Sequence, residues 1–118
     1  YGYYKNILVR QLKSIKAAYP GVSIIVIGPS DMSKNNGGQK VSYSNIPLIR
    51  DAMKEAAFET GSCFWDLYEA MGGKNSMVAW VKKGLAQKDY THFSFKGAKY
   101  VGEMFYEAIM QEIDKEIE

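Results

Sequence analysis

The sequence predicts an α/β protein with a three-layer α/β/α architecture, in which helices cover both sides of a parallel sheet. Amphipathic helical segments alternate with short strands along the 118 residues, and this alternation is typical of parallel sheets. One strand is a continuous aliphatic and β-branched run, a composition that indicates burial on both faces. The length is that of a single domain, so we expect one hydrophobic core and no internal linker.

The first two elements are a helix and a strand. Apolar residues at helical spacing predict a helix over residues 3–19, which ends at Pro20 because proline cannot continue the hydrogen-bond ladder. Residues 22–27 are the β-branched strand. Residues 32–44 are polar and lack periodicity, so we expect a long loop whose 35–38 stretch is a flexible turn.

A second helix and a second strand follow. Helical spacing of apolar residues continues over 46–57, with Pro47 near the first turn and Gly61 just past the end. Residues 62–68 are rich in aromatic side chains and predict a short strand. Residues 69–87 predict short helical turns that are broken by glycines.

The last element is a long helix that begins near Ser94, since serine is a favourable N-cap. Its apolar face carries Val101, Phe105, Ala108, Ile109 and Ile113. Trp80 and Val81, in the preceding helical turns, are the expected buried anchors of that segment.

Two convincing strands are too few to cover two helix layers. The chain also begins with Tyr1 rather than methionine, so we expect a signal peptide or a larger piece of protein upstream. We interpret residues 1–118 as the C-terminal half of one larger α/β domain. An unpaired sheet edge would then be exposed, and we expect the isolated chain either to self-associate through it or to be only marginally stable.

Composition excludes several classes of protein. The net charge of +2 gives no reason to expect a nucleic-acid partner. The longest aliphatic run, residues 24–27, is far shorter than a membrane span. One cysteine, Cys63, cannot form an intrachain disulfide, and one histidine, His92, makes a zinc site within this chain improbable. We therefore expect no metal and no cofactor.

The most informative stretch is Lys88-Asp89-Tyr90-Thr91-His92-Phe93-Ser94. A turn at this spacing can bring the Asp89 carboxylate against Nδ1 of His92, which leaves Nε2 to take a proton from a serine hydroxyl. This is the base half of a serine-hydrolase triad. The alternative is a turn-capping aspartate beside a histidine that packs against Phe93 or Tyr90.

The order of these elements resembles the C-terminal part of the SGNH, or GDSL-like, hydrolase family. The resemblance rests on the Asp89-x-x-His92 block before the last helix, the Phe64-Trp65-Asp66-Leu67-Tyr68 strand and the strand closed by Gly28-Pro29. The stretch from Asp66 to Gly73, followed by Trp80-Val81, looks closest to branches that remove acetyl esters from polysaccharides.

The resemblance implies an ester hydrolase with a flavodoxin-like fold, in which His92 is the general base and Asp89 orients it. The family's nucleophilic serine lies in a G-D-S block, which this sequence lacks, so we assign no nucleophile here and expect the chain alone to be inactive. An acetylated carbohydrate substrate favours a secreted or periplasmic location. The alternative is a non-catalytic module that binds a polysaccharide or a protein through its long loops.

Several other residues have a functional and a plainer interpretation. Trp80 and Tyr90 are the aromatic residues that we expect to line a substrate pocket, although core packing also explains aromatic side chains. Ser30 follows a strand, where α/β proteins bind ligands, but a turn role is more common. Asp31 and Asp66 could form a glycosidase-like carboxylate pair or could cap turns.

Overall fold

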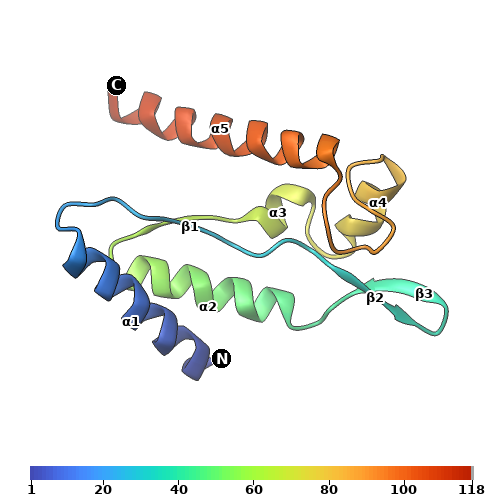
Figure 1. Cartoon of the computed structure of the whole chain (residues 1–118), viewed down its shortest axis with the longest axis horizontal. Helices are drawn as coiled ribbons and strands as arrows, with labels where there is room; N and C mark the ends of the chain where they lie inside the picture. The colour runs from blue at the N-terminus through green and yellow to red at the C-terminus, as the bar shows by residue number, and fades with distance from the viewer. Residues whose placement is uncertain (118) are drawn as a thin grey trace. The chain divides into compact units, whose positions relative to one another are not determined.

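The computed structural model describes residues 1–117, and the surroundings of side chains over residues 1–115 (Figure 1). The described chain forms two compact units. The first combines residues 1–30 with 43–73, and the second combines residues 31–42 with the chain from Lys74 onward. Each unit is considered by itself below.

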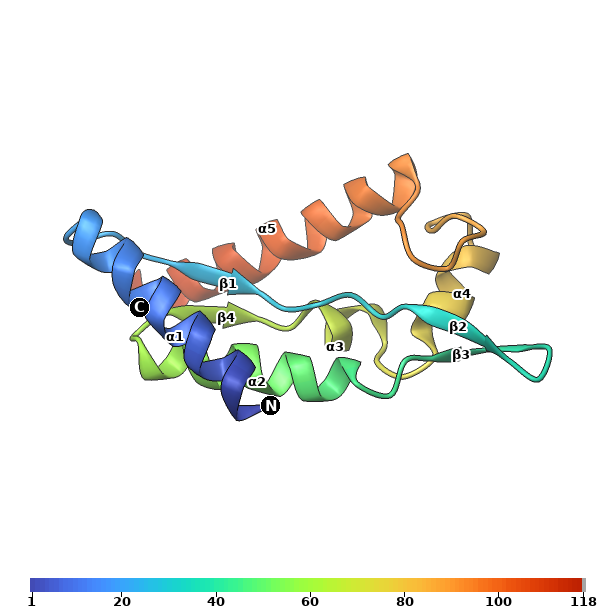
Figure 2. The same ribbon diagram turned by 60° about the horizontal axis from the view of Figure 1, so that its bottom comes forward.

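The first unit contains a parallel sheet of two strands, β1 (Ile25–Ile27) and β4 (Cys63–Trp65). The two strands lie side by side (Figure 2), with Ile25 opposite Cys63 and Ile27 opposite Trp65 in the register. The helices of this unit are α1 (Gly2–Ala18), α2 (Ile46–Glu59) and α3 (Leu67–Met71). The α/β class with a parallel sheet is therefore confirmed.

The core of this unit lies where α1 and α2 meet the sheet. Its buried members are Val9, Leu12, Val26, Ala56 and Ala57. Because alanine has only a methyl side chain, the two alanines let α2 pack closely against its neighbours. Lys16 of α1 donates hydrogen bonds to the carbonyl oxygens of Thr60 and Gly61, which ties the end of α2 to α1.

Both strands are shorter than the sequence predicts. Residues 22–24 precede β1, and the expected strand over 62–68 ends at Trp65 because Asp66 caps α3, with its carboxylate accepting from the Glu69 N–H at 3.0 Å. The expectation of burial on both faces is wrong for β1 of the described chain. Val26 is buried, whereas Ile25 and Ile27 are 43% and 46% exposed.

The second unit begins with an antiparallel hairpin of β2 (Ser33–Asn36) and β3 (Gln39–Ser42). The expected structureless loop over 32–44 is therefore wrong. The turn consists of Gly37 and Gly38, with φ values of +61° and +85°. Left-handed conformations at both positions match the twist of a two-residue hairpin, and glycine adopts them without a steric penalty.

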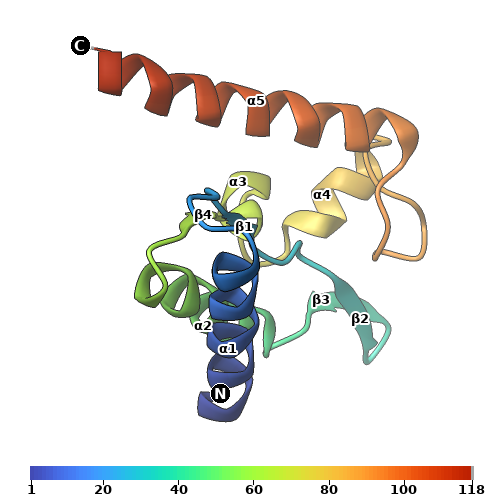
Figure 3. The ribbon, with the colours of Figure 1, turned by 60° about the vertical axis from the view of Figure 1, so that its left-hand side comes forward.

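The helices of the second unit are α4 (Ser76–Lys82) and α5 (Phe95–Ile117). The hairpin lies beside α4 (Figure 3), and Ser42 of β3 exchanges hydrogen bonds with Asn75 at the start of that helix. No helix within residues 1–117 is long and apolar enough to cross a bilayer.

Ser94 caps α5 as predicted, since its Oγ accepts from the Gly97 N–H at 3.1 Å. The same hydroxyl donates to the carbonyl oxygen of Gly84 at 2.6 Å. Gly97 makes a close approach possible here, because a Cβ at this position would overlap the carbonyl oxygen of Leu85. The start of α5 is thus fixed directly against the segment that leads into the Asp89–His92 loop.

Candidate catalytic loop

The loop between α4 and α5 is closed at its base. Ala86 and Phe93 form an antiparallel β-bridge, and the Gln87 N–H donates to the His92 carbonyl oxygen at 2.9 Å. The Ser94 N–H donates to the Leu85 carbonyl oxygen at 3.1 Å. These backbone bonds hold the two ends of the loop together, so its tip has a defined geometry.

Asp89 and His92 contact each other at the tip of this loop. Nδ1 of His92 lies 2.6 Å from Oδ2 of Asp89, within the range expected from the three-residue spacing. The other carboxylate oxygen, Oδ1, accepts from the N–H groups of Thr91 at 3.0 Å and His92 at 3.1 Å. Asp89 therefore both shapes the turn and orients the imidazole ring.

These hydrogen bonds stabilise the ionised form of Asp89. The side-chain bond to His92, followed by the backbone bonds from His92 and Thr91, lowers the pKa of Asp89 from 3.8 to about 2. An ionised carboxylate only accepts hydrogen bonds, so Nδ1 carries the proton in this pair. The ring is 72% exposed, and its remaining nitrogen, Nε2, is the atom that can exchange protons with a bound molecule.

Tyr90 lies between these two residues and is held by its backbone. Its φ of +56° is left-handed, its N–H donates to the Gln87 carbonyl oxygen, and its carbonyl accepts from the Ser33 N–H, both at 3.0 Å. The ammonium group of Lys40, on β3, lies 4.8 Å from the centroid of the Tyr90 ring. The expected contact of Tyr90 with substrate stays a prediction.

Trp80 is a buried residue of the second unit, with 5% of its surface exposed. Its ring packs against Phe93 at 5.4 Å and edge-on against Tyr100 at 5.6 Å between centroids. The structure thus gives Trp80 the anchoring role that the sequence also predicted. A contact with substrate stays an untested prediction for this side chain, and its burial does not favour one.

A carboxylate of the same unit is buried, which its sequence context did not indicate. Asp31 is completely buried, and it accepts from the Ser42 hydroxyl at 2.7 Å and from the Met77 N–H at 2.9 Å. These partners are 11 and 46 residues away along the chain. A single carboxylate therefore links the hairpin to the N-terminus of α4, and we call Asp31, Ser42 and Asn75 the hairpin clasp.

Asp66 has a separate structural role in the first unit. Besides capping α3, its carboxylate accepts from Arg50 at 3.2 Å. Arg50 also lies 5.5 Å from the centroid of the Tyr68 ring. Both Asp31 and Asp66 are thus explained by capping and local hydrogen bonds, which is the plainer interpretation of these two residues.

The serines of the second unit are occupied elsewhere or buried. Ser42 donates to Asp31, and Ser94 donates to Gly84. The hydroxyls of Ser33 and Ser76 are buried. No serine hydroxyl among the described residues is hydrogen-bonded to His92. The described part of the chain also holds no group of three side chains suited to a metal ion.

No protein-family model matches the chain, and no curated protein is significantly similar to it. Among solved structures, one of a peptidoglycan O-acetylesterase in action has a TM-score of 0.87 and 26% sequence identity. The match covers 94% of this chain but 32% of that chain. The chain therefore has the fold of a part of an esterase and spans about a third of that protein's length.

Proposed function

We propose that this chain is the C-terminal part of an ester hydrolase of the SGNH, or GDSL-like, type that removes acetyl groups from a carbohydrate. The observation that carries the proposal is the 2.6 Å contact between Asp89 and His92, in a loop that leads directly into the last helix. The likeness to a peptidoglycan O-acetylesterase supports the same reaction class.

In the proposed mechanism His92 is the general base. Nε2 takes the proton of a serine hydroxyl as that oxygen attacks the ester carbonyl, and it then returns the proton to the departing sugar alkoxide. Asp89 stays ionised, because its pKa is held at about 2, and it stabilises the imidazolium that forms. The serine and the oxyanion-hole donors are supplied by sequence outside residues 1–118. Asp89 and His92 need no metal or cofactor for these steps.

The test is the deacetylation of acetylated glycan by the full-length protein. Replacing His92→Ala should reduce kcat by about 10³-fold or more, and Asp89→Asn by about 10²–10⁴-fold, because the imidazole then loses its orientation and its counter-charge. Replacing Lys115→Gln, which removes an exposed charge near the end of α5, is the matched control. Wild-type kcat in the His92→Ala protein would contradict the proposal.

The rival is a non-catalytic module that binds a glycan or a protein through the hairpin and the Asp89–His92 loop. The absence of a serine bonded to His92 among the described residues is the observation in its favour. If the full-length protein binds acetylated glycan but releases no acetate, this rival is correct.

A further inference from the structure

Charge is distributed unevenly along the second unit. Residues 31–42 and 74–100 contain eight lysines and two aspartates, whereas residues 101–118 contain one lysine and six acidic residues. The lysines are Lys34, Lys40, Lys74, Lys82, Lys83, Lys88, Lys96 and Lys99. The net charge of the whole chain therefore conceals a basic region that belongs to the elements around the catalytic loop.

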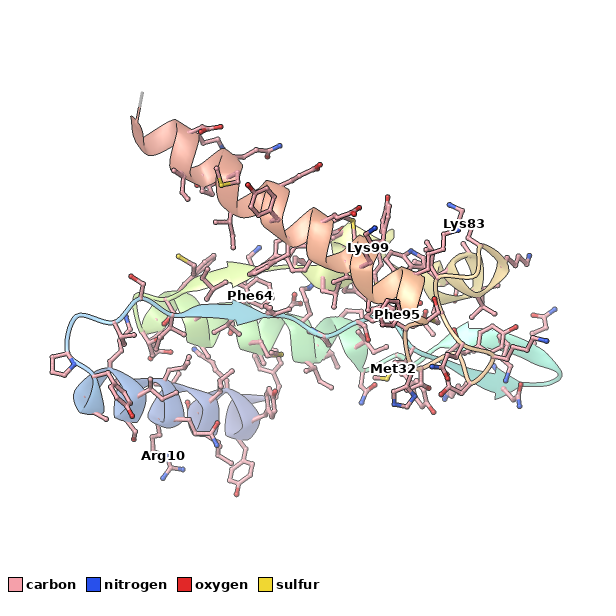
Figure 4. All side chains as sticks on the ribbon, turned by 45° about the horizontal axis from the view of Figure 1, so that its top comes forward. Arg10, Met32, Phe64, Lys83, Phe95 and Lys99 are labelled. Atoms are coloured by element: carbon pink, nitrogen blue, oxygen red, sulfur yellow. The ribbon has the colours of Figure 1, made fainter. Side chains whose placement is uncertain are left out.

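The negative charges of this region do not neutralise its surface. Asp31 is completely buried, and the carboxylate of Asp89 is engaged with His92 and with two backbone N–H groups. Most of the lysines are exposed, and Figure 4 shows Lys83 and Lys99 on the end of α4 and the start of α5. Clustered like charges of this kind attract anionic ligands and raise their association rate.

The position of Lys40 is fixed by its surroundings. It is half-buried, and its ammonium group lies over the ring of Tyr90. Tyr90 itself lies between Asp89 and His92 in the sequence. An ammonium group at this distance from an aromatic face is held by cation–π attraction. No carboxylate of the described residues lies within ion-pair distance of Lys40, so its charge stays available to a ligand.

The strand that carries Lys40 is fixed in turn. The hairpin clasp joins β3 to α4 through the buried carboxylate of Asp31 and through the reciprocal bonds of Ser42 and Asn75. The Ser33 N–H joins β2 to the Tyr90 carbonyl oxygen. One backbone hydrogen bond and the side-chain bonds of the clasp therefore hold the strand of Lys40 and the catalytic loop together. The ammonium group then needs little ordering when a ligand binds.

We propose that Lys40, held over the ring of Tyr90 in the Asp89–His92 loop, forms an anion subsite that binds a carboxylate or phosphate group of the acylated substrate. The proposal rests on the esterase function proposed above. It narrows the substrate class to esters whose alcohol part carries a negative charge. Lys40 is then a specificity-determining residue, because it discriminates between charged and neutral substrates by electrostatic attraction.

Binding to the full-length His92→Ala protein tests this inference without turnover. Calorimetry would compare O-acetylated N-acetylmuramic acid, its neutral lactamide and an O-acetylated sugar phosphate. We expect the anionic ligands to bind more tightly than the amide, and Lys40→Gln to reduce that preference about fivefold, the size of a strong exposed ion pair. The preference between carboxylate and phosphate identifies the anionic group.

Two controls separate charge from structure. Lys40→Arg keeps the charge and should retain the preference, while Lys115→Gln changes the net charge equally and should leave it as in the parent protein. Equal dissociation constants for the amide and both anionic ligands, or a preference that Lys40→Gln does not reduce, would overturn the anion subsite. Turnover that survives His92→Ala would instead contradict the esterase mechanism, so the two failures are distinguishable.

Discussion

The backbone N–H of Ser33 donates a hydrogen bond to the carbonyl oxygen of Tyr90 at 3.0 Å. This bond joins the hairpin to the loop that carries Asp89 and His92. The hairpin itself depends on Asp31, whose carboxylate accepts from the Ser42 hydroxyl and the Met77 N–H. The position of the Asp89–His92 loop in the second unit therefore depends on the side chain of Asp31.

Removing the Asp31 carboxylate should destabilise the second unit. Asp31→Ala leaves the buried Met77 N–H and the Ser42 hydroxyl without their acceptor, and we expect a loss of about 2–4 kcal/mol in the free energy of unfolding. Urea unfolding measures this change in the free energy of unfolding. The control is Glu103→Ala, which removes an exposed carboxylate of α5. Apart from the difference in helix propensity between the two residues, it should change the free energy of unfolding by less than about 0.5 kcal/mol. Equal midpoints for the two variants would show that Asp31 does not support the hairpin.

Two glycines of α5 should respond to alanine in opposite directions. At Gly97 the new methyl group would overlap the Leu85 carbonyl oxygen, so Gly97→Ala should destabilise the protein by about 2 kcal/mol or more. At Gly102 nothing lies within 4 Å of the added carbon, and alanine is the better helix former by about 1 kcal/mol. Thermal melts should therefore shift down for Gly97→Ala and up for Gly102→Ala. A rise in Tm for both would contradict the close approach.

The contribution of Asp89 to stability should depend on pH with a known sign. Its pKa falls from 3.8 to about 2 on folding, so between these values the unfolded state binds more protons than the folded state. The stabilisation is complete above the ordinary pKa and is lost as pH falls through the folded value. The difference in Tm between wild type and Asp89→Ala should be constant near neutral pH and shrink toward pH of about 2. A difference that grows on acidification would contradict this pairing.

The exposed strand residues predict self-association of the isolated chain. Ile25, Ile27 and Cys63 all belong to the two-stranded sheet and are exposed, and such an edge pairs readily with another chain. Sedimentation of the chain at micromolar concentration, with reductant present, should show species larger than a monomer. Ile27→Lys should shift the distribution toward monomer. A monodisperse wild-type monomer with a Tm above about 60 °C, high for a mesophilic domain, would mean that these residues form a complete domain.

The isolated chain should show no esterase activity above that of its His92→Ala variant. The isolated chain would have a general base but neither a nucleophile nor oxyanion-hole donors. Loss of an oxyanion-hole donor alone typically reduces the rate by about 10²–10³-fold. Release of p-nitrophenol from p-nitrophenyl acetate measures it. Turnover that is abolished by replacing one of the chain's own serines would show that the nucleophile lies within residues 1–118.

Local sequence signals predicted the helices and the Asp89–His92 contact because both depend on residues close together in the chain. The hairpin was missed, although Gly37-Gly38, the two residues of its turn, is a known hairpin signal. Its flanking strands, Ser33–Asn36 and Gln39–Ser42, are polar, so they lack the alternation by which a half-buried strand is recognised. Backbone pairing and the clasp stabilise this hairpin, and neither leaves a hydrophobic pattern in the sequence.

Long-range contacts account for most of what the sequence left undetermined. Asp31 follows a strand, as many solvated aspartates do, and its burial depends on Met77, 46 residues away. Trp80 was assigned both to the core and to a pocket, because an aromatic residue satisfies either environment. The structure supplies its neighbours Phe93 and Tyr100, and these neighbours explain its burial.

Among the described residues, the hydrogen bonds that orient the imidazole ring are made within the loop whose base is the Ala86–Phe93 bridge. So short a loop closes at a small entropic cost, and the Asp89–His92 contact joins two residues only three apart in sequence. The contact between Asp89 and His92 should therefore be kept when the chain is cut or rejoined outside this loop. A circular permutation that leaves residues 85–94 intact should preserve the hydrogen bond between Asp89 and His92. If the proposed function holds, two separately expressed polypeptides, one bearing the serine and one bearing this loop, would reconstitute activity by fragment complementation.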